Sequence, residues 1–93
     1  MFKIKAADGK NNVCGERIAA LRKEKGYSQR KLAAQMQLLG FDVDHYFIRR
    51  VENGERFVTD IDLVIFCRAL EVPLTAVLSV ENAPVQTEIP DSL

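Results

Sequence analysis

Two stretches of this chain decide its fold: GERIAALRKEKGYSQRKLAAQM (residues 15–36) and VDHYFIRRVENGERFVTDIDLVIFCRALEVPLTAVL (residues 43–78). Both carry apolar residues at intervals of three and four, the spacing of an amphipathic helix. Glycines, a proline and an Asn-Gly pair interrupt the pattern at short intervals, so it divides into several short helices. The sequence therefore predicts an all-α domain.

The ends of the first three helices can be predicted from the residues that start and stop helices. The first helix runs from about Cys14 to Lys25 and stops at Gly26. Ser28 caps the second helix, which ends at Gly40, and Asp44 caps the third, which ends at Asn53-Gly54. The expected buried positions are Cys14, Ile18 and Leu21, then Leu32, Ala33, Met36 and Leu39, then Ile48 and Val51.

Two further helices complete the predicted domain. Thr59 and Asp62 form a capping-box pattern at the start of a helix from about Asp60 to Leu70. Pro73 suits the first turn of a short helix from Leu74 to Val80. Short loops between five helices predict a compact orthogonal bundle.

The chain divides into an N-terminal arm (1–12), the helical domain (13–80) and a C-terminal tail (81–93). In the arm, residues 2–5 alternate apolar and basic side chains, which predicts a short strand, and residues 8–12 are turn-forming. The tail contains Pro84 and Pro90 and no strong periodicity, so we expect it to be extended or flexible.

Length and composition exclude several classes of protein. The chain has 93 residues and is 47% hydrophobic, which suits one compact domain. No apolar run approaches the roughly 18 residues of a membrane span, and no signal peptide is recognisable, so we expect a cytoplasmic protein without a membrane partner. Cys14 and Cys67 lack metal-ligand spacing; we expect small buried side chains, with a redox switch as the alternative. No metal or other cofactor is expected.

Charge is unevenly distributed along the chain. The formal net charge is zero, but residues 1–56 hold 12 Lys and Arg against 7 Asp and Glu, a net +5. Residues 57–93 hold 1 basic residue against 6 acidic ones, a net −5. The first part can therefore supply a phosphate-facing surface while the second part faces away from it.

The ordered motifs between Gly15 and Leu78 resemble the lambda-repressor/Cro-like helix-turn-helix family, also called the xenobiotic-response-element (XRE) family. The motifs are Arg17-Ile18, Leu21-Arg22, Gly26-Tyr27-Ser28-Gln29, Leu32-Ala33, Ile48, Arg50-Val51-Glu52-Asn53-Gly54 and Ala69-Leu70-Val72. The resemblance implies a DNA-binding transcriptional regulator whose third helix enters the major groove of double-stranded DNA. It also implies a homodimer on a two-fold, inverted-repeat operator, and we expect a repressor of bacterial or phage type.

The resemblance also implies roles for single residues. The base-reading positions are His45, Tyr46 and Arg50. The phosphate-contacting candidates are Ser28, Gln29, Arg30, Lys31, Arg49, Asn53 and Arg56. Arg22 and Glu52 match a buried ion pair that ties the first helix to the third. Arg50 is the strongest base-reading candidate because a guanidinium can give guanine two parallel hydrogen bonds; the alternative is a solvated surface arginine.

The chain departs from the family pattern at several positions. Residues 37–41 look like five extra residues that lengthen the second helix and widen the turn. Phe47 stands where a small polar residue is common, and we expect it to pack against Leu38, Leu39 and Phe41. Asp44 and Glu55 place negative charge where DNA is expected, which should weaken nonspecific binding.

Two surfaces are candidates for the dimer contact. Ile61, Ile65 and Arg68 share a stripe on the fourth helix, which either the residue 2–5 strand or a second subunit could cover. The residues expected to fill the core from that helix are Leu63, Val64, Phe66 and Cys67. Leu74, Val77 and Leu78 of the fifth helix form the other candidate, although completion of the core is the preferred explanation for them.

Two other functions compete with DNA binding. The same fold could serve as a protein-interaction module, such as an antitoxin or adaptor, whose tail wraps a partner. An enzyme could be built around Asp42, Asp44 and His45, but no nucleophile or metal-ligand set accompanies them. We therefore expect no catalytic activity.

Overall fold

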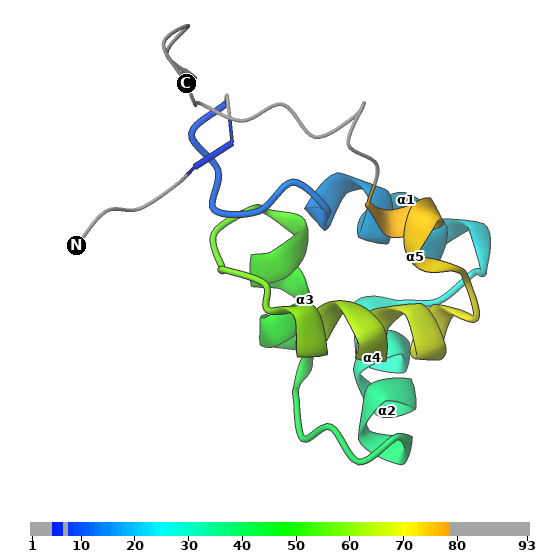
Figure 1. The fold of residues 1–93 in the computed structure, drawn as a ribbon. Coiled ribbons are helices and arrows are strands. Elements are labelled where there is room, and N and C mark those ends of the chain that lie inside the picture. The colour runs from blue at the N-terminus through cyan, green and yellow to red at the C-terminus, as the bar shows by residue number, and fades with distance from the viewer. Residues whose placement is uncertain (1–4, 7, 79–93) are drawn as a thin grey trace, which may run out of the picture.

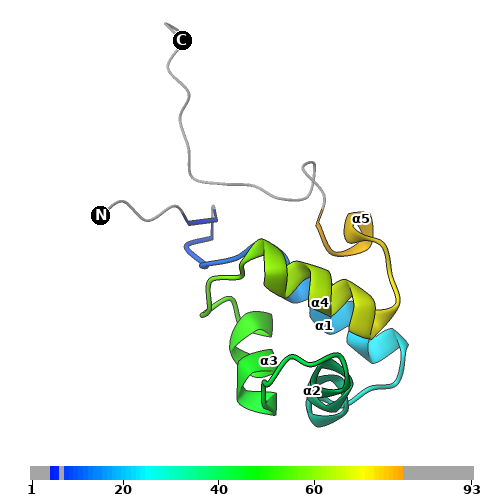
Figure 2. The same ribbon diagram turned by 60° about the horizontal axis from the view of Figure 1, so that its bottom comes forward.

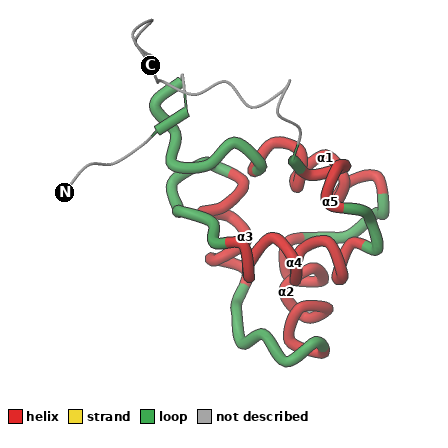
Figure 3. The backbone as a smooth tube through the Cα atoms, viewed as in Figure 1, coloured by secondary structure: helices red, strands yellow, loops and turns green. Residues whose placement is uncertain are grey.

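The computed structural model describes residues 5–6 and 8–78, which form five helices joined by loops (Figures 1 and 3). The helices are α1 (Gly15–Glu24), α2 (Gln29–Leu38), α3 (His45–Glu52), α4 (Asp60–Leu70) and α5 (Leu74–Val77). The predicted all-α, five-helix architecture is therefore confirmed. The predicted strand at residues 2–5 and the tail at 81–93 lie largely or wholly outside the described residues.

Side-chain caps explain why three helices begin where they do. The Ser28 side chain accepts a hydrogen bond from the Lys31 amide, and the Asp44 side chain accepts one from the Phe47 amide. Thr59 and Asp62 form the predicted reciprocal capping box, and α4 has the predicted bounds. Each cap satisfies a backbone N–H that has no partner within its own helix. Pro73 is the N-cap of α5 rather than part of its first turn.

The core lies where α1 and α4 meet the α2–α3 pair. α2 packs against α3 and α4, while α1 contacts α3, α4 and α5 (Figure 2). The largest fully buried side chains are Phe66, Ile18, Leu32, Met36, Ile48, Leu70, Val51 and Val77. Val77 is buried and Leu78 is partly buried against the core, as the sequence favours, whereas Leu74, which was expected to help complete the core, is 50% exposed.

Three further apolar side chains differ from their predicted positions. Leu39 is 45% exposed because α2 ends at Leu38, which leaves Leu39 in the cap. Val64 is 49% exposed because it lies about 200° around α4 from the buried Phe66. Ile65 is partly buried against the core rather than exposed, so Ile61, at 65%, is the exposed isoleucine of α4.

The two cysteines are free thiols. Cys14 is buried in the core, as expected, and desolvation by burial raises its pKa to about 11. Cys67 is partly buried, and burial raises its pKa too. Both thiols therefore stay protonated near neutral pH, which is the less reactive form.

Candidate nucleic-acid interface

The N-terminus of α2 forms one part of the candidate interface. Ser28, Arg30 and Lys31 are all exposed there. Ser28 Oγ accepts a hydrogen bond from the Lys31 amide at 3.0 Å, so the hydroxyl hydrogen remains able to donate to a phosphate. The positive end of the helix dipole favours an anion at this place. The geometry therefore suits a phosphate group in front of α2.

A buried ion pair joins α1 to α3. Arg22 donates from Nε to Glu52 Oε2 at 2.6 Å and from Nη2 to Glu52 Oε1 at 2.9 Å. The side chains are only 11% and 7% exposed. Arg22 Nη1 also donates to the carbonyl of Tyr27 at 2.8 Å, in the turn before α2. One guanidinium thus connects α1, the turn before α2, and α3 in a fixed geometry.

Gln29 belongs to the same network. Its Nε2 donates to Glu52 Oε1 at 3.0 Å, and the residue is half-buried. One amide hydrogen is therefore used inside the domain, and the second remains for a phosphate. This bond also ties the first residue of α2 to the last residue of α3, which fixes the two helices of the motif relative to each other.

The outward face of α3 carries most of the predicted base-reading residues. Ile48 and Val51 are fully buried, whereas Tyr46, Arg49 and Arg50 are exposed. His45, expected to be exposed, is half-buried, and its ring lies 4.1 Å from the Tyr46 ring, centroid to centroid. The helix therefore presents a polar, cationic edge while its opposite side anchors it in the core.

The segment after α3 adds two of the phosphate-contacting candidates. Asn53 and Arg56 are both exposed. The Arg56 guanidinium carbon lies 4.7 Å from the centroid of the Phe47 ring, within the range of a cation–π contact. Gly54 turns the chain here with φ of +76°, a conformation that favours glycine. Arg50 and Arg56 line one shallow hollow together with Asp42 and Asp44.

Aromatic packing gives the long α2–α3 turn a defined conformation. Phe47 stacks on Phe66 with ring centroids 5.9 Å apart, and Phe41 meets Phe47 edge-on at 6.0 Å. Gln37 Nε2 donates to the Val43 carbonyl at 2.7 Å across the turn. The expected Phe47–Phe41 contact is therefore present, while Leu38 points away and is exposed.

Sequence reasoning missed two residues that contact this region. Asn11 and Asn12 were expected to be turn residues, yet both donate hydrogen bonds to backbone carbonyls at the end of α3 or just after it. Asparagine in a turn-forming stretch is common, so the sequence contains no sign of this contact.

Neither a membrane span nor a metal cluster is found in the part of the chain that the structure describes. No helix there is long and apolar enough to cross a bilayer. Within the same residues, His, Cys, Asp and Glu do not gather in groups of three or more that could hold a metal ion. Asp44, from the predicted enzyme alternative, is occupied as the cap of α3.

Solved structures with a similar fold include three bacterial proteins. The restriction-modification controller protein C.AhdI from Aeromonas hydrophila is 30% identical, with a TM-score of 0.61 over 69% of this chain and 86% of that chain. The clp gene regulator ClgR from C. glutamicum is 24% identical, with a TM-score of 0.63 over 72% and 80%. The hypothetical transcription factor NHTF from Neisseria is 21% identical, with a TM-score of 0.63 over 87% and 88%. The last two similarities concern the fold alone.

The sequence of the domain matches a known family. Among curated proteins, none matches this chain. Residues 14–79, however, match the family model of the helix-turn-helix domain, and this range contains all five helices. Since the match spans well over half of the sequence and agrees with the arrangement of α2 and α3, the chain belongs to the helix-turn-helix family of DNA-binding transcriptional regulators.

Proposed function

We propose that this protein is a sequence-specific repressor of bacterial or phage type that binds an inverted-repeat operator as a dimer. The observation that carries the proposal is the exposed cationic edge of α3, held in place by the buried Arg22–Glu52 pair. A dimer would place two α3 helices in successive major grooves about 34 Å apart and exclude polymerase from the site. The similar protein C.AhdI is itself described as a controller of a restriction-modification system.

The proposed contacts divide into two groups. His45, Tyr46 and Arg50 read base edges from α3, and the remaining contacts bind the phosphate backbone. The phosphate-contacting residues are Ser28, Gln29, Arg30, Lys31, Arg49, Asn53 and Arg56. Both groups lie on α2, α3 or the segment after α3, so one face of the domain could make all the contacts.

Selection from a random pool of DNA duplexes tests the proposal directly. The full chain is expected to enrich an inverted repeat, because each protomer of a two-fold dimer reads the same half-site. A single unrepeated site would contradict the dimer. If no sequence is enriched, the protein does not read bases, and the proposed function fails.

Replacing Arg50 with alanine is expected to remove discrimination at one base pair of each half-site. The loss should be about 5- to 150-fold per contact, corresponding to about 1–3 kcal/mol for a bidentate arginine–guanine pair. Competition between the selected operator and duplexes mutated at each position measures it. Arg49→Ala is the matched control on the same helix, since loss of a phosphate contact should weaken binding to all duplexes alike. An unchanged preference in Arg50→Ala would exclude Arg50 from base reading.

The outer face of α4 is the proposed dimer contact. Ile61 and Val64 are exposed apolar side chains three residues apart, so they form a stripe on one side of α4, and the exposed Phe57 lies in the loop before the helix. Asp60 precedes this stripe and Arg68 follows it. Antiparallel packing of two α4 helices would pair each Asp60 with the partner subunit's Arg68 around a centre at Val64.

Replacing Ile61 with aspartate is expected to shift the protein from dimer to monomer. A charge buried in a self-complementary contact occurs twice, once in each subunit, and each copy would lack a partner. Sedimentation at several concentrations measures the change. Leu74→Asp is the matched comparison on α5, the other candidate surface: Leu74 is also exposed, at 50% against 65% for Ile61, and its replacement should leave an α4 dimer intact. If Ile61→Asp remains as dimeric as the unmodified chain, α4 is not the interface.

A further inference from the structure

The segment before α1 crosses the end of α3 and binds its backbone. The Asn11 amide donates to the Gly54 carbonyl at 2.8 Å, and Asn11 Nδ2 donates to the Glu55 carbonyl at 2.9 Å. Lys10 packs so closely over Gly54 that a Cβ at that glycine would lie within 2.8 Å of three Lys10 side-chain carbons. Residues 10–12, which we call the strap, therefore hold the turn that contains two phosphate-contacting candidates.

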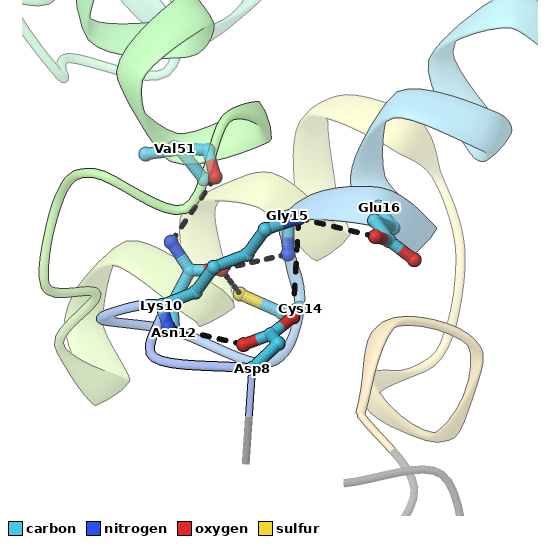
Figure 4. A network of polar contacts seen from close by, with 7 residues as sticks. All are labelled: Asp8, Lys10, Asn12, Cys14, Gly15, Glu16 and Val51. Carbon is cyan, nitrogen blue, oxygen red and sulfur yellow. Dashed lines mark hydrogen bonds and ion pairs between the residues drawn. The ribbon is translucent and has the colours of Figure 1, made fainter. Parts of the chain in front are cut away.

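Among the strap residues, Asn12 makes three side-chain hydrogen bonds to backbone groups, and Figure 4 shows those to Val51 and Gly15. Its Nδ2 donates to the Val51 carbonyl at 3.0 Å, and its Oδ1 accepts from the Gly15 amide at 2.9 Å. Nδ2 also donates to the Arg56 carbonyl at 2.9 Å. Both amide hydrogens and the oxygen are thus used. An aspartate would lack the donors, and a glutamine would be one methylene too long for the same positions.

These three bonds connect the start of α1 to the end of α3. The Gly15 amide opens α1 and has no partner within its own helix, and Val51 belongs to the last turn of α3. Gly15 lets the two helix ends approach, because a Cβ there would clash with the Val51 carbonyl oxygen. The α1–α3 contact therefore has two anchors, the Arg22–Glu52 pair and Asn12.

Arg56 is held at its backbone and at its side chain. Its carbonyl accepts from Asn12, its amide donates to the Arg50 carbonyl at 3.3 Å, and its guanidinium lies over Phe47. The rest of the segment at 53–56 is attached by Asn11 and by backbone amides that donate to carbonyls of α3. Asn12 is therefore one of three contacts that set the position of Arg56 relative to the edge of α3.

We infer that Asn12 is a positioning residue for DNA binding, which acts by fixing the backbone that carries Arg56. The inference rests on the proposed function, since it assigns Asn12 a part in the same DNA contact. The Asn12 side chain is used inside the domain, so we assign it no DNA contact of its own. Preorganisation of Arg56 means that less conformational freedom is lost when the guanidinium meets a phosphate.

The experiment is a double-mutant cycle between Asn12 and Arg56, read out as affinity for the selected operator. Asn12→Ser keeps a side-chain oxygen that can accept a hydrogen bond but lacks the two amide hydrogens that Asn12 gives to the Val51 and Arg56 carbonyls. We expect Asn12→Ser and Arg56→Ala each to weaken binding about 10-fold or more. The double variant should bind within about 2-fold of Arg56→Ala alone, because Asn12 acts through Arg56. A general loss of stability would instead give additive effects.

The controls separate the possible outcomes. Each variant is measured at a temperature where its helical circular dichroism shows a folded domain. If Asn12→Ser does not fold, Asn11→Ala, which removes only the bond to the Glu55 carbonyl, enters the same cycle. The inference is overturned if the effects on operator affinity are additive, or if the strap variant in the cycle (Asn12→Ser, or Asn11→Ala in its place) binds the operator as tightly as the unmodified chain. Failure of the unmodified chain to prefer any operator would refute the proposed function itself, which is a different result.

Discussion

The free energy of unfolding is expected to fall by about 3–5 kcal/mol when Glu52 is replaced by alanine. The substitution removes both carboxylate oxygens that accept from Arg22 and also removes the acceptor of Gln29. The Arg22 guanidinium would remain buried with only the Tyr27 carbonyl as its partner. An unpaired buried charge is among the most destabilising changes a small domain can undergo.

Denaturant unfolding followed by circular dichroism measures this loss, since a domain of this size is expected to unfold in one step. Glu55→Ala is the matched control, because it removes an exposed carboxylate from the same region. The double variant Arg22→Met/Glu52→Leu should regain much of the stability, because apolar side chains need no charged partner. A Glu52→Ala variant as stable as the control would show that Arg22 finds water or another partner.

The helices of this fold could be predicted from the sequence because their determinants are local. The cap residues Ser28, Asp44 and Thr59 each act within three positions of their own place in the chain. Helical spacing likewise identified the deeply buried positions of α1 and α3. It did less well on α4, where residues 63–67 are all apolar and the spacing does not distinguish Val64 from Phe66.

The contacts that fix the candidate interface could be predicted only in part. The Arg22–Glu52 pair follows from the family resemblance, because both residues stand in its motifs. The strap could not be predicted, because Asn12 binds backbone carbonyls 39 and 44 residues away and any residue can offer a carbonyl. The bond from Gln29 to Glu52 was missed for a related reason: its geometry depends on how α2 and α3 pack, which no local pattern encodes.

Affinity for the selected operator is expected to fall by about 10⁴-fold between about 50 mM and 200 mM salt. Four of the proposed phosphate-contacting residues are cationic: Arg30, Lys31, Arg49 and Arg56. A dimer would neutralise about eight phosphates and release their counterions, which gives a slope of about −7 in a plot of log affinity against log salt concentration. Titration of a labelled operator at several salt concentrations measures this slope.

Variants that each lack one cationic side chain show whether the salt dependence arises from the proposed DNA-contacting residues of α2 and α3. Lys31→Met should make it less steep by about 2, because each protomer of the dimer loses one phosphate contact. Arg17→Met is the matched control: Arg17 also lies on an exposed helix surface, but its Nε donates to the Ala76 carbonyl of α5 at 3.1 Å. Removing that charge should leave the slope unchanged, because the side chain is directed toward α5 and not toward α2 or α3. If the two variants change the slope equally, the affinity reflects the overall charge of the domain. If the affinity of the unmodified chain does not change with salt, phosphate neutralisation is excluded.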